Sequence, residues 1–455
     1  MTTRAREFEL RASRRTLLGV ASGGAATAAL CTTGLAAAVS SDQAASRTLP
    51  SEQTESTGGF DVARLGVMHE TMARHAGTDG LPGLVTCISR GEDTDLQMYG
   101  NMTTDGDTPM QEDAIFRIAS VTKPIVAVAA MALVEDATLR LDDPVDPFLP
   151  ELANRRVLRS LESDISDTVP ADRPITLRDL LTLTPGYGAI FAMPGTYPIQ
   201  QAMDDAGLSA GPNLPEMTDD EMLRRYADLP LVAQPGTRWL YNNGSDILGI
   251  LLARATNTSL GELLKQRIFD PLGMEDSGFF VPEDKLDRLP AMYYRDPTSG
   301  EVMEFDVAGA ESRFASPPVF ESGAGGLVST AANLLAFGEM MRGNGTRGDV
   351  RVLSRASVAL MTTNQIRPEQ ATAADFFPGF WDAHGWGFGL AIDTARAQLF
   401  MTPGRYGWDG GYGTSLYIDP IEDVIGVLLT QQTWDGVGLP RVLTDFWNGT
   451  YQALA

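Results

Sequence analysis

The sequence predicts an α/β fold of the α+β kind, in which an antiparallel sheet flanked by helices carries an inserted all-helical lobe. Strand-like runs occur near both ends of the 455-residue chain, whereas helix signals dominate between them. Gly, Pro and Asp separate the strand-like runs of the C-terminal third, as in hairpins. Strands at both ends with helices between them indicate one α/β lobe built from both ends of the chain. We therefore assign 60–118 and 300–455 to the α/β lobe and 119–299 to the helical lobe.

The N-terminal part of the α/β lobe is predicted to be a helix followed by a hairpin. Apolar residues recur at helical spacing within 60–75, namely Val62, Leu65, Met68 and Met72. Gly and Pro at 80–83 end this helix. The apolar run 84–89 then predicts a strand, and 96–99 predicts its hairpin partner.

Helices are predicted through the helical lobe and just beyond it. The most apolar of them covers 121–134. Thr176 and Asp179 have the spacing of a capping box, which indicates a helix that begins near 179. The remaining helices are expected at 245–255, 260–268 and 330–342.

The C-terminal third is predicted to supply most of the sheet. Its short apolar or alternating runs are 387–392, 398–402, 414–418 and 424–430. A last helix is expected over 440–453.

Residues 1–40 have the features of a secretory signal peptide. A basic segment is followed by a stretch rich in Ala, Gly and Leu that ends in small residues. The segment Ser13-Arg14-Arg15-Thr16-Leu17-Leu18 resembles a twin-arginine signal. We expect export to the periplasm or the extracellular space, with 41–59 as a flexible tether and no stable membrane insertion after cleavage. The alternative is that 1–40 stays attached as a membrane anchor.

Composition excludes several classes of function. The formal net charge of −24 disfavours nucleic-acid binding, because phosphate backbones are repelled. Three histidines in the whole chain disfavour a histidine-rich metal site. Cys87 lies in an apolar strand-like run, so we expect a buried and inert thiol.

Ser120-Val121-Thr122-Lys123 is the first motif that indicates chemistry. It is an S-x-x-K at the predicted start of a helix, and residues three apart share a helix face. A serine hydroxyl becomes a useful nucleophile when a neighbouring group accepts its proton. Lys123 is suited to this if burial lowers the pKa of its ammonium. The alternative is a capping serine with a surface lysine.

Tyr241-Asn242-Asn243 is the second motif. It has the pattern Y-x-N and lies between a Pro-Gly turn and a predicted helix. A tyrosinate beside an ammonium is a competent base, and we expect Asn243 to orient Lys123 or a substrate carbonyl. The alternative is a loop tyrosine that only packs on the helical lobe.

These motifs, in this order, resemble the penicillin-recognising serine hydrolases, which include class C β-lactamases, DD-peptidases and β-lactamase-like carboxylesterases. Flanking segments are similar to the family's blocks as well, and they lie at 176–186, 235–239, 268–274 and 323–330. The resemblance spans about 60–450. It implies a β-lactamase/transpeptidase-like fold for the lobes predicted above.

The resemblance also implies a third element on a strand edge, which is normally K-T-G or H-x-G. Its counterpart here is Trp408-Asp409-Gly410, similar to the W-x-G of carboxylesterase-like members. By the same resemblance, the N–H of Gly411 pairs with that of Ser120 to form an oxyanion hole. Because Trp408 replaces a cation, a substrate carboxylate is bound less well, which favours an esterase or amidase over a β-lactamase.

The sequence therefore predicts an exported serine hydrolase that cleaves a small-molecule ester, amide or peptide through an acyl-enzyme, with no cofactor and no metal. Ser120 attacks, and Lys123 and Tyr241 take the proton and return it to the leaving group. We expect Trp408, Tyr187 and Phe191 to shape the acyl pocket, and His384 is a further candidate for the cleft. Two alternatives stay open. One is a D,D- or D-amino peptidase or weak β-lactamase that acts on cell-wall-type substrates, and the other is a non-catalytic envelope binding protein with the same fold.

Overall fold

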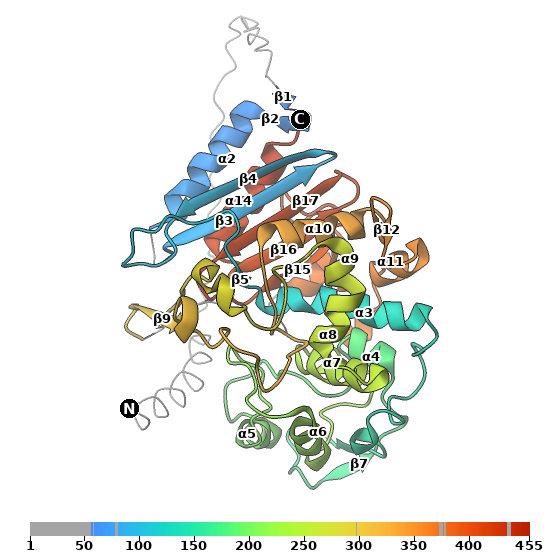
Figure 1. Cartoon of the computed structure of the whole chain (residues 1–455). Helices are drawn as coiled ribbons and strands as arrows, with labels where there is room; N and C mark the ends of the chain where they lie inside the picture. The colour runs from blue at the N-terminus through green and yellow to red at the C-terminus, as the bar shows by residue number, and fades with distance from the viewer. Residues whose placement is uncertain are drawn as a thin grey trace, which may run out of the picture.

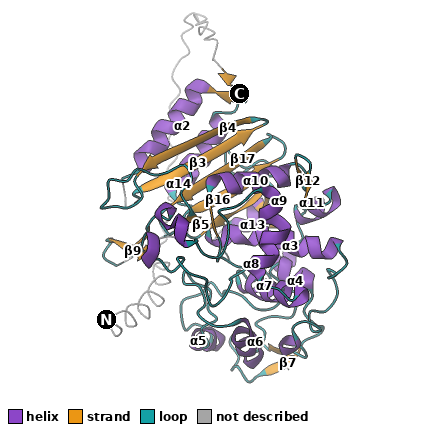
Figure 2. Cartoon of the chain, viewed as in Figure 1, coloured by secondary structure: helices purple, strands orange, loops and turns teal. Residues whose placement is uncertain are grey.

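A computed structural model describes residues 56–455, apart from 58, 78–80, 297, 373–375, 377–378 and 435–437. The fold class predicted from the sequence is confirmed: an antiparallel sheet lies beside a mainly helical region (Figures 1 and 2). The predicted signal peptide and nearly all of the tether lie outside the described residues. No helix among those residues is both long enough and apolar enough to cross a bilayer.

The main sheet has the strand order β13-β14-β15-β16-β17-β3-β4, and every neighbouring pair is antiparallel. Its seven strands lie in the two ranges that were assigned to the α/β lobe. The strands are β3 (Gly83–Arg90), β4 (Asp93–Gly100), β13 (His384–Trp386), β14 (Ala391–Asp393), β15 (Tyr406–Gly410), β16 (Thr414–Asp419) and β17 (Val424–Thr430).

Strand β3 is buried on both faces of the sheet, whereas the edge strand β4 is partly exposed. Successive side chains of a strand point to opposite sides, so β3 contributes to two cores. On β3, Leu84 and Ile88 join the core under helices α2 (Val62–His75) and α14 (Arg441–Gln452). Val85 and Cys87 join the core shared with α10 (Ala331–Arg342) and the helical lobe. Cys87 is 1% exposed, and burial raises the pKa of its thiol to about 12, so it is the inert thiol that was predicted.

The helical lobe is organised around α3 (Thr122–Glu135), which is buried on every side from Thr122 to Leu133. A helix that is apolar all round forms the centre of a core rather than its surface. The predicted capping box is present, with Thr176 and Asp179 bonding each other's backbone at the start of α4 (Leu177–Leu181). Further helices of this lobe are α5 (Pro198–Asp205), α6 (Asp219–Asp228), α7 (Asn243–Thr256), α8 (Leu260–Leu264), η4 (Lys265–Phe269) and α9 (Asp270–Leu272).

Smaller elements complete the described chain. Short antiparallel pairs are β1 (Ser56–Thr57) with β2 (Phe60–Asp61), β5 (Phe116–Arg117) with β10 (Val328–Ser329), β6 (Arg156–Leu158) with β7 (Thr168–Pro170), β8 (Met292–Arg295) with β9 (Val302–Asp306), and β11 (Thr346–Arg347) with β12 (Val350–Arg351). The short helices are η2 (Ala119–Val121), η3 (Pro150–Leu152), η5 (Glu283–Arg288), η6 (Gly309–Glu311), α11 (Arg355–Met361), α12 (Pro368–Thr372) and α13 (Phe380–Ala383).

Two strand predictions were wrong. The run 398–402 forms no strand, because Phe400 and Met401 are buried from a turn instead of from a sheet edge. The run 387–392 is not one strand either, since residues 387–390 turn between β13 and β14. In both cases apolar residues signalled burial correctly, but tertiary packing decided the backbone conformation.

Candidate active site

Ser120 lies between the sheet and the helical lobe, in the short helix η2 that leads into α3. The preceding Ala119 has a φ of 44°, a left-handed conformation that is strained for a residue with a Cβ. Just before it, the guanidinium of Arg117 is buried and donates from Nε to Asp306 Oδ2 at 2.6 Å and from Nη1 to Pro290 O at 2.6 Å. This buried ion pair holds the strained loop and therefore the position of the Ser120 hydroxyl.

Lys123 lies one helical turn after Ser120 and is 1% exposed. Its Nζ donates to Ser120 Oγ at 2.9 Å, to Asn242 Oδ1 at 2.8 Å and to Ala324 O at 2.6 Å, so all three N–H groups of the ammonium have acceptors. Burial lowers the pKa of Lys123 to about 7, although the nearby carboxylate of Asp246 acts in the opposite direction. A neutral amine is therefore accessible near neutral pH.

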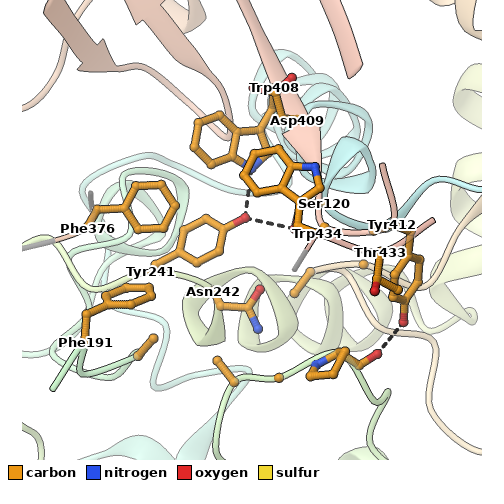
Figure 3. A pocket seen from close by; sticks show the side chains of 18 of the residues that line it. Ser120, Phe191, Tyr241, Asn242, Phe376, Trp408, Asp409, Tyr412, Thr433 and Trp434 are labelled. Atoms are coloured by element: carbon orange, nitrogen blue, oxygen red, sulfur yellow. Dashed lines mark hydrogen bonds between the residues drawn. The ribbon is translucent and has the colours of Figure 1, made fainter. Parts of the chain in front are cut away.

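The phenol of Tyr241 points towards the same hydroxyl (Figure 3). Its OH donates to Ser120 Oγ at 2.9 Å and accepts from Trp408 Nε1 at 2.8 Å. Lys123 Nζ lies 4.6 Å from the centre of the phenol ring. Burial raises the pKa of Tyr241 to about 12, so the phenol stays protonated near neutral pH and acts as a hydrogen-bond donor.

The asparagine that contacts Lys123 is Asn242 and not the predicted Asn243. Helix α7 begins at Asn243, whose amide donates to Leu208 O at 2.7 Å and to Tyr226 OH at 2.6 Å in the core. Asn242 has a φ of 81°, and this left-handed turn directs its side chain towards Lys123. The Y-x-N spacing could not reveal this local turn.

Asp246 and Ala324 were also missed by the sequence analysis. The Asp246 carboxylate is 5% exposed and accepts from Ser322 Oγ at 2.7 Å and from the Ala324 N–H at 3.0 Å. Asp246 thus fixes the backbone whose carbonyl accepts from Lys123. A charged residue within the apolar run of 245–255 was the signal that would have identified it.

The segment Trp408–Gly411 approaches Ser120 along the end of β15. A Cβ on Gly410 would lie 2.4 Å from Ile118 O, so glycine lets the strand pack directly against the nucleophile loop. A Cβ on Gly411 would meet nothing within 4 Å, and Gly411 lines the same cavity as Ser120. Trp408 faces Tyr241, whereas Asp409 points to the opposite face of β15 and accepts from Ser415 Oγ at 2.6 Å. The oxyanion role of Gly411 stays a prediction.

A cavity of about 1080 Å³ opens at Ser120. Beside Tyr241 its wall is aromatic: the Phe376 ring lies 4.9 Å from that of Tyr241 and 5.2 Å from that of Phe191, which is 43% exposed (Figure 3). Phe191 therefore lines the cavity, and its predicted place in the acyl pocket stays a prediction. Tyr187 was expected here as well, but it is buried in the helical lobe and its OH donates to Tyr226 O at 2.7 Å. Within the described part of the chain, His, Cys, Asp and Glu form no group of three that would hold a metal ion.

A serine hydroxyl that contacts a buried lysine and a tyrosine, on an α+β fold with an inserted helical lobe, defines a serine hydrolase of the S-x-x-K type. The chain belongs to the Beta-lactamase family, whose model matches residues 68–438.

Named relatives support the esterase side of this family. The chain is 37% identical to Protein Rv1367c of Mycobacterium tuberculosis over 361 aligned residues. The aligned region covers 78% of this chain and 87% of the relative. The chain is 32% identical to Esterase EstB of Burkholderia gladioli over 386 aligned residues, and this alignment covers 80% of this chain and 89% of the esterase. The solved structure of EstCE1, described as a hydrolase with promiscuous acyltransferase activity, superposes with a TM-score of 0.70 at 25% identity and covers 86% of this chain and 99% of that one. The protein is thus a β-lactamase-fold hydrolase of the esterase and acyltransferase kind.

Proposed function

We propose that this protein is an exported carboxylester hydrolase that works through an acyl-enzyme on Ser120. The observation that carries the proposal is the position of Ser120 Oγ, 2.9 Å from both Lys123 Nζ and Tyr241 OH. Export is supported by the sequence pattern of residues 1–40.

Lys123 is the first proton acceptor of the proposed reaction. Its amine becomes neutral as the pH rises through about 7, whereas Tyr241 keeps its proton in that range. The neutral amine still donates to Asn242 and Ala324, and its lone pair then faces the Ser120 hydroxyl. The Ser120 oxygen attacks the ester carbonyl, and its proton passes to Lys123 as the tetrahedral intermediate forms.

Tyr241 completes the transfer of the proton to the leaving group. Its OH donates at the Ser120 oxygen, so it lies beside the alkoxide that departs when the carbon–oxygen bond of the ester breaks. The proton held by Lys123 replaces the one that Tyr241 gives up. Water then attacks the acyl-enzyme by the same steps in reverse. The backbone N–H groups of Ser120 and Gly411 are proposed to hold the oxyanion.

The substrate class follows from the cavity. Trp408 offers one neutral N–H, already bonded to Tyr241, where other members of the family carry a cation. A carboxylate beside the reacting carbonyl therefore has no charged partner in the third motif. The aromatic wall of Phe191 and Phe376 favours an apolar leaving group. Uncharged carboxylic esters are preferred over penicillins and over peptides with a free C-terminal carboxylate.

The test compares p-nitrophenyl butyrate, nitrocefin and a D-Ala-D-Ala peptide as substrates, together with labelling by a fluorophosphonate probe and intact mass measurement. The wild type should turn over the ester fastest and gain one adduct, which Ser120→Ala abolishes. Ser209→Ala removes another hydroxyl on the cavity wall and should keep the label. Preference for nitrocefin or the peptide would favour the β-lactamase or peptidase alternative. Absence of both label and turnover in the wild type would favour the binding protein.

A further inference from the structure

The turn that follows β15 consists mainly of glycine. β15 ends at Gly410 and β16 begins at Thr414, so Gly411, Tyr412 and Gly413 connect the two strands. The Gly413 N–H donates to Gly410 O at 2.9 Å. Because a peptide unit is planar and trans, the N–H of Gly411 points away from that bonded carbonyl. Glycine restrains its own backbone very little, so the direction of this N–H depends on what else holds the turn.

Tyr412 is the one residue of this turn that carries a side chain. It is 4% exposed, and its OH donates to Pro212 O (Figure 3). Its ring belongs to a small buried cluster that also contains Ala119, the residue before Ser120. Burial raises the pKa of Tyr412 to about 12, so its hydroxyl stays a donor near neutral pH. Tyr412 thus links the turn both to the nucleophile loop and to a second segment of the chain.

The segment that accepts this bond is fastened to the helical lobe. Leu208 O accepts from Asn243 Nδ2 at 2.7 Å, at the start of α7. From there, residues 208–212 run along the cavity as irregular chain as far as Pro212, where the hydroxyl of Tyr412 donates. The bond therefore holds the turn of the sheet against the helical lobe at the edge of the cavity.

We propose that Tyr412 is a positioning residue of the oxyanion hole, and that its bond to Pro212 and its packing in one cluster with Ala119 hold the Gly411 N–H beside that of Ser120. This inference rests on the proposed esterase function. Two N–H groups stabilise an oxyanion together only when both lie at hydrogen-bond distance from the same oxygen. A loosened turn weakens this interaction most in the transition state, because the ester carbonyl carries a full negative charge only after attack.

The first test removes one hydroxyl. Tyr412→Phe keeps the ring and its packing but cannot donate to Pro212. With p-nitrophenyl butyrate, kcat should fall by about tenfold with little change in KM. Tyr187→Phe is a matched control: Tyr187 is 2% exposed, its OH donates to Tyr226 O at 2.7 Å, and it does not line the cavity. The control should lower the melting temperature and keep kcat. Unchanged kcat in Tyr412→Phe, or an equal loss in Tyr187→Phe, would overturn the proposal.

The second test compares two ligands that differ in the charge on the reacting oxygen. Butyl trifluoromethyl ketone forms a hemiketal: the Ser120 oxygen bonds to the carbonyl carbon, the hydroxyl proton passes to Lys123, and the carbonyl oxygen becomes an oxyanion. Its inhibition constant should rise by about tenfold in Tyr412→Phe, by the same factor as kcat/KM falls. N-butyl butyramide forms no oxyanion when it is titrated calorimetrically into Ser120→Ala. Its affinity should stay the same when Tyr412→Phe is added to that background.

The two ligands also separate this proposal from the proposed function. Equal losses of affinity for the ketone and the amide would show that Tyr412 shapes the whole cavity, and the role in the oxyanion hole would be refuted. An active wild type whose kcat and ketone affinity do not change in Tyr412→Phe would refute the role of Tyr412 alone. A wild type with no ester turnover, no fluorophosphonate label and no ketone adduct by mass would refute the proposed function, and the role of Tyr412 with it.

Discussion

The ammonium nitrogen of Lys123 lies 2.9 Å from the oxygen of Ser120 and donates its other two hydrogens to Asn242 and Ala324. When Lys123 is neutral, its one lone pair therefore faces the Ser120 hydroxyl and can accept the proton of that hydroxyl. The site is built around a lysine that burial makes easier to deprotonate.

The first prediction concerns the pH dependence of ester hydrolysis. Below about 7 Lys123 is an ammonium and cannot accept the proton of Ser120, so kcat/KM should rise about tenfold per pH unit and level off above that pH. The measurement is the hydrolysis of p-nitrophenyl butyrate from pH 5 to about 9 in buffers of constant ionic strength. In Asp246→Asn the carboxylate that raises the pKa of Lys123 is gone, so the rising limb should move to lower pH. A limb above pH 9 in the wild type, or a shift to higher pH in the variant, would contradict this account.

How much of this site the sequence predicts depends on the separation of its parts. Ser120 and Lys123 are three residues apart, so helix geometry alone brings them together. Tyr241 lies 121 residues from Ser120, and only the family resemblance placed them together. The Y-x-N pattern selects Asn243, whereas a positive φ at Asn242 brings the preceding asparagine to Lys123 instead. Ala324 acts through its backbone carbonyl, which no side-chain motif reports.

The same dependence on tertiary packing limits how much of the fold the sequence predicts. The apolar run 84–89 predicted a strand, and local pattern and tertiary burial agree there, since Leu84 and Ile88 are buried on one face and Val85 and Cys87 on the other. At Phe400 and Met401 they disagree. Those side chains are buried from a turn, and a sequence pattern cannot distinguish that burial from burial in a sheet.

The second prediction separates the two asparagines. Asn242→Gly keeps the left-handed backbone, since glycine accepts a positive φ, but removes an acceptor of Lys123. We expect kcat to fall by about ten- to a hundredfold with little change in melting temperature. Asn243→Ala removes buried hydrogen bonds to Leu208 and Tyr226, so it should lower stability by about 1–3 kcal/mol and change kcat less. Kinetics and thermal melting of both variants provide the measurement, and the reverse pattern would restore the role predicted for Asn243.

The third prediction concerns the indole of Trp408. Trp408→Phe keeps an aromatic ring but removes the N–H that donates to Tyr241, so transition-state charge on the phenol oxygen loses a partner. We expect kcat to fall by about tenfold, with a smaller change in KM. Trp386→Phe is a matched control, because Trp386 is buried 4.7 Å from Trp408, ring centre to ring centre, and its Nε1 has no partner in the described residues. This control should change stability more than kcat, and equal losses of kcat in both variants would show that packing alone is responsible.

The last prediction concerns Asp409, the middle residue of the third motif. Burial raises the pKa of its carboxyl to about 6, whereas an unfolded chain has the ordinary value near 4. At pH values between those two pKa values, the Asp409 carboxyl keeps its proton in the folded protein and loses it in the unfolded chain. The contribution of this group to stability is therefore full at low pH and decreases as the pH rises through about 4 to 6.

Asp409→Asn keeps one oxygen acceptor for Ser415, presents an amide N–H to the Tyr417 hydroxyl and has no charge to bury. Relative to the wild type, it should be stabilised by about 1–2 kcal/mol at pH 8 and by little or nothing at pH 4. The measurement is the denaturant midpoint of both proteins at the two pH values. A larger gain at pH 4 than at pH 8 would mean that Asp409 is ionised in a favourable setting, and burial would then not be what controls its pKa.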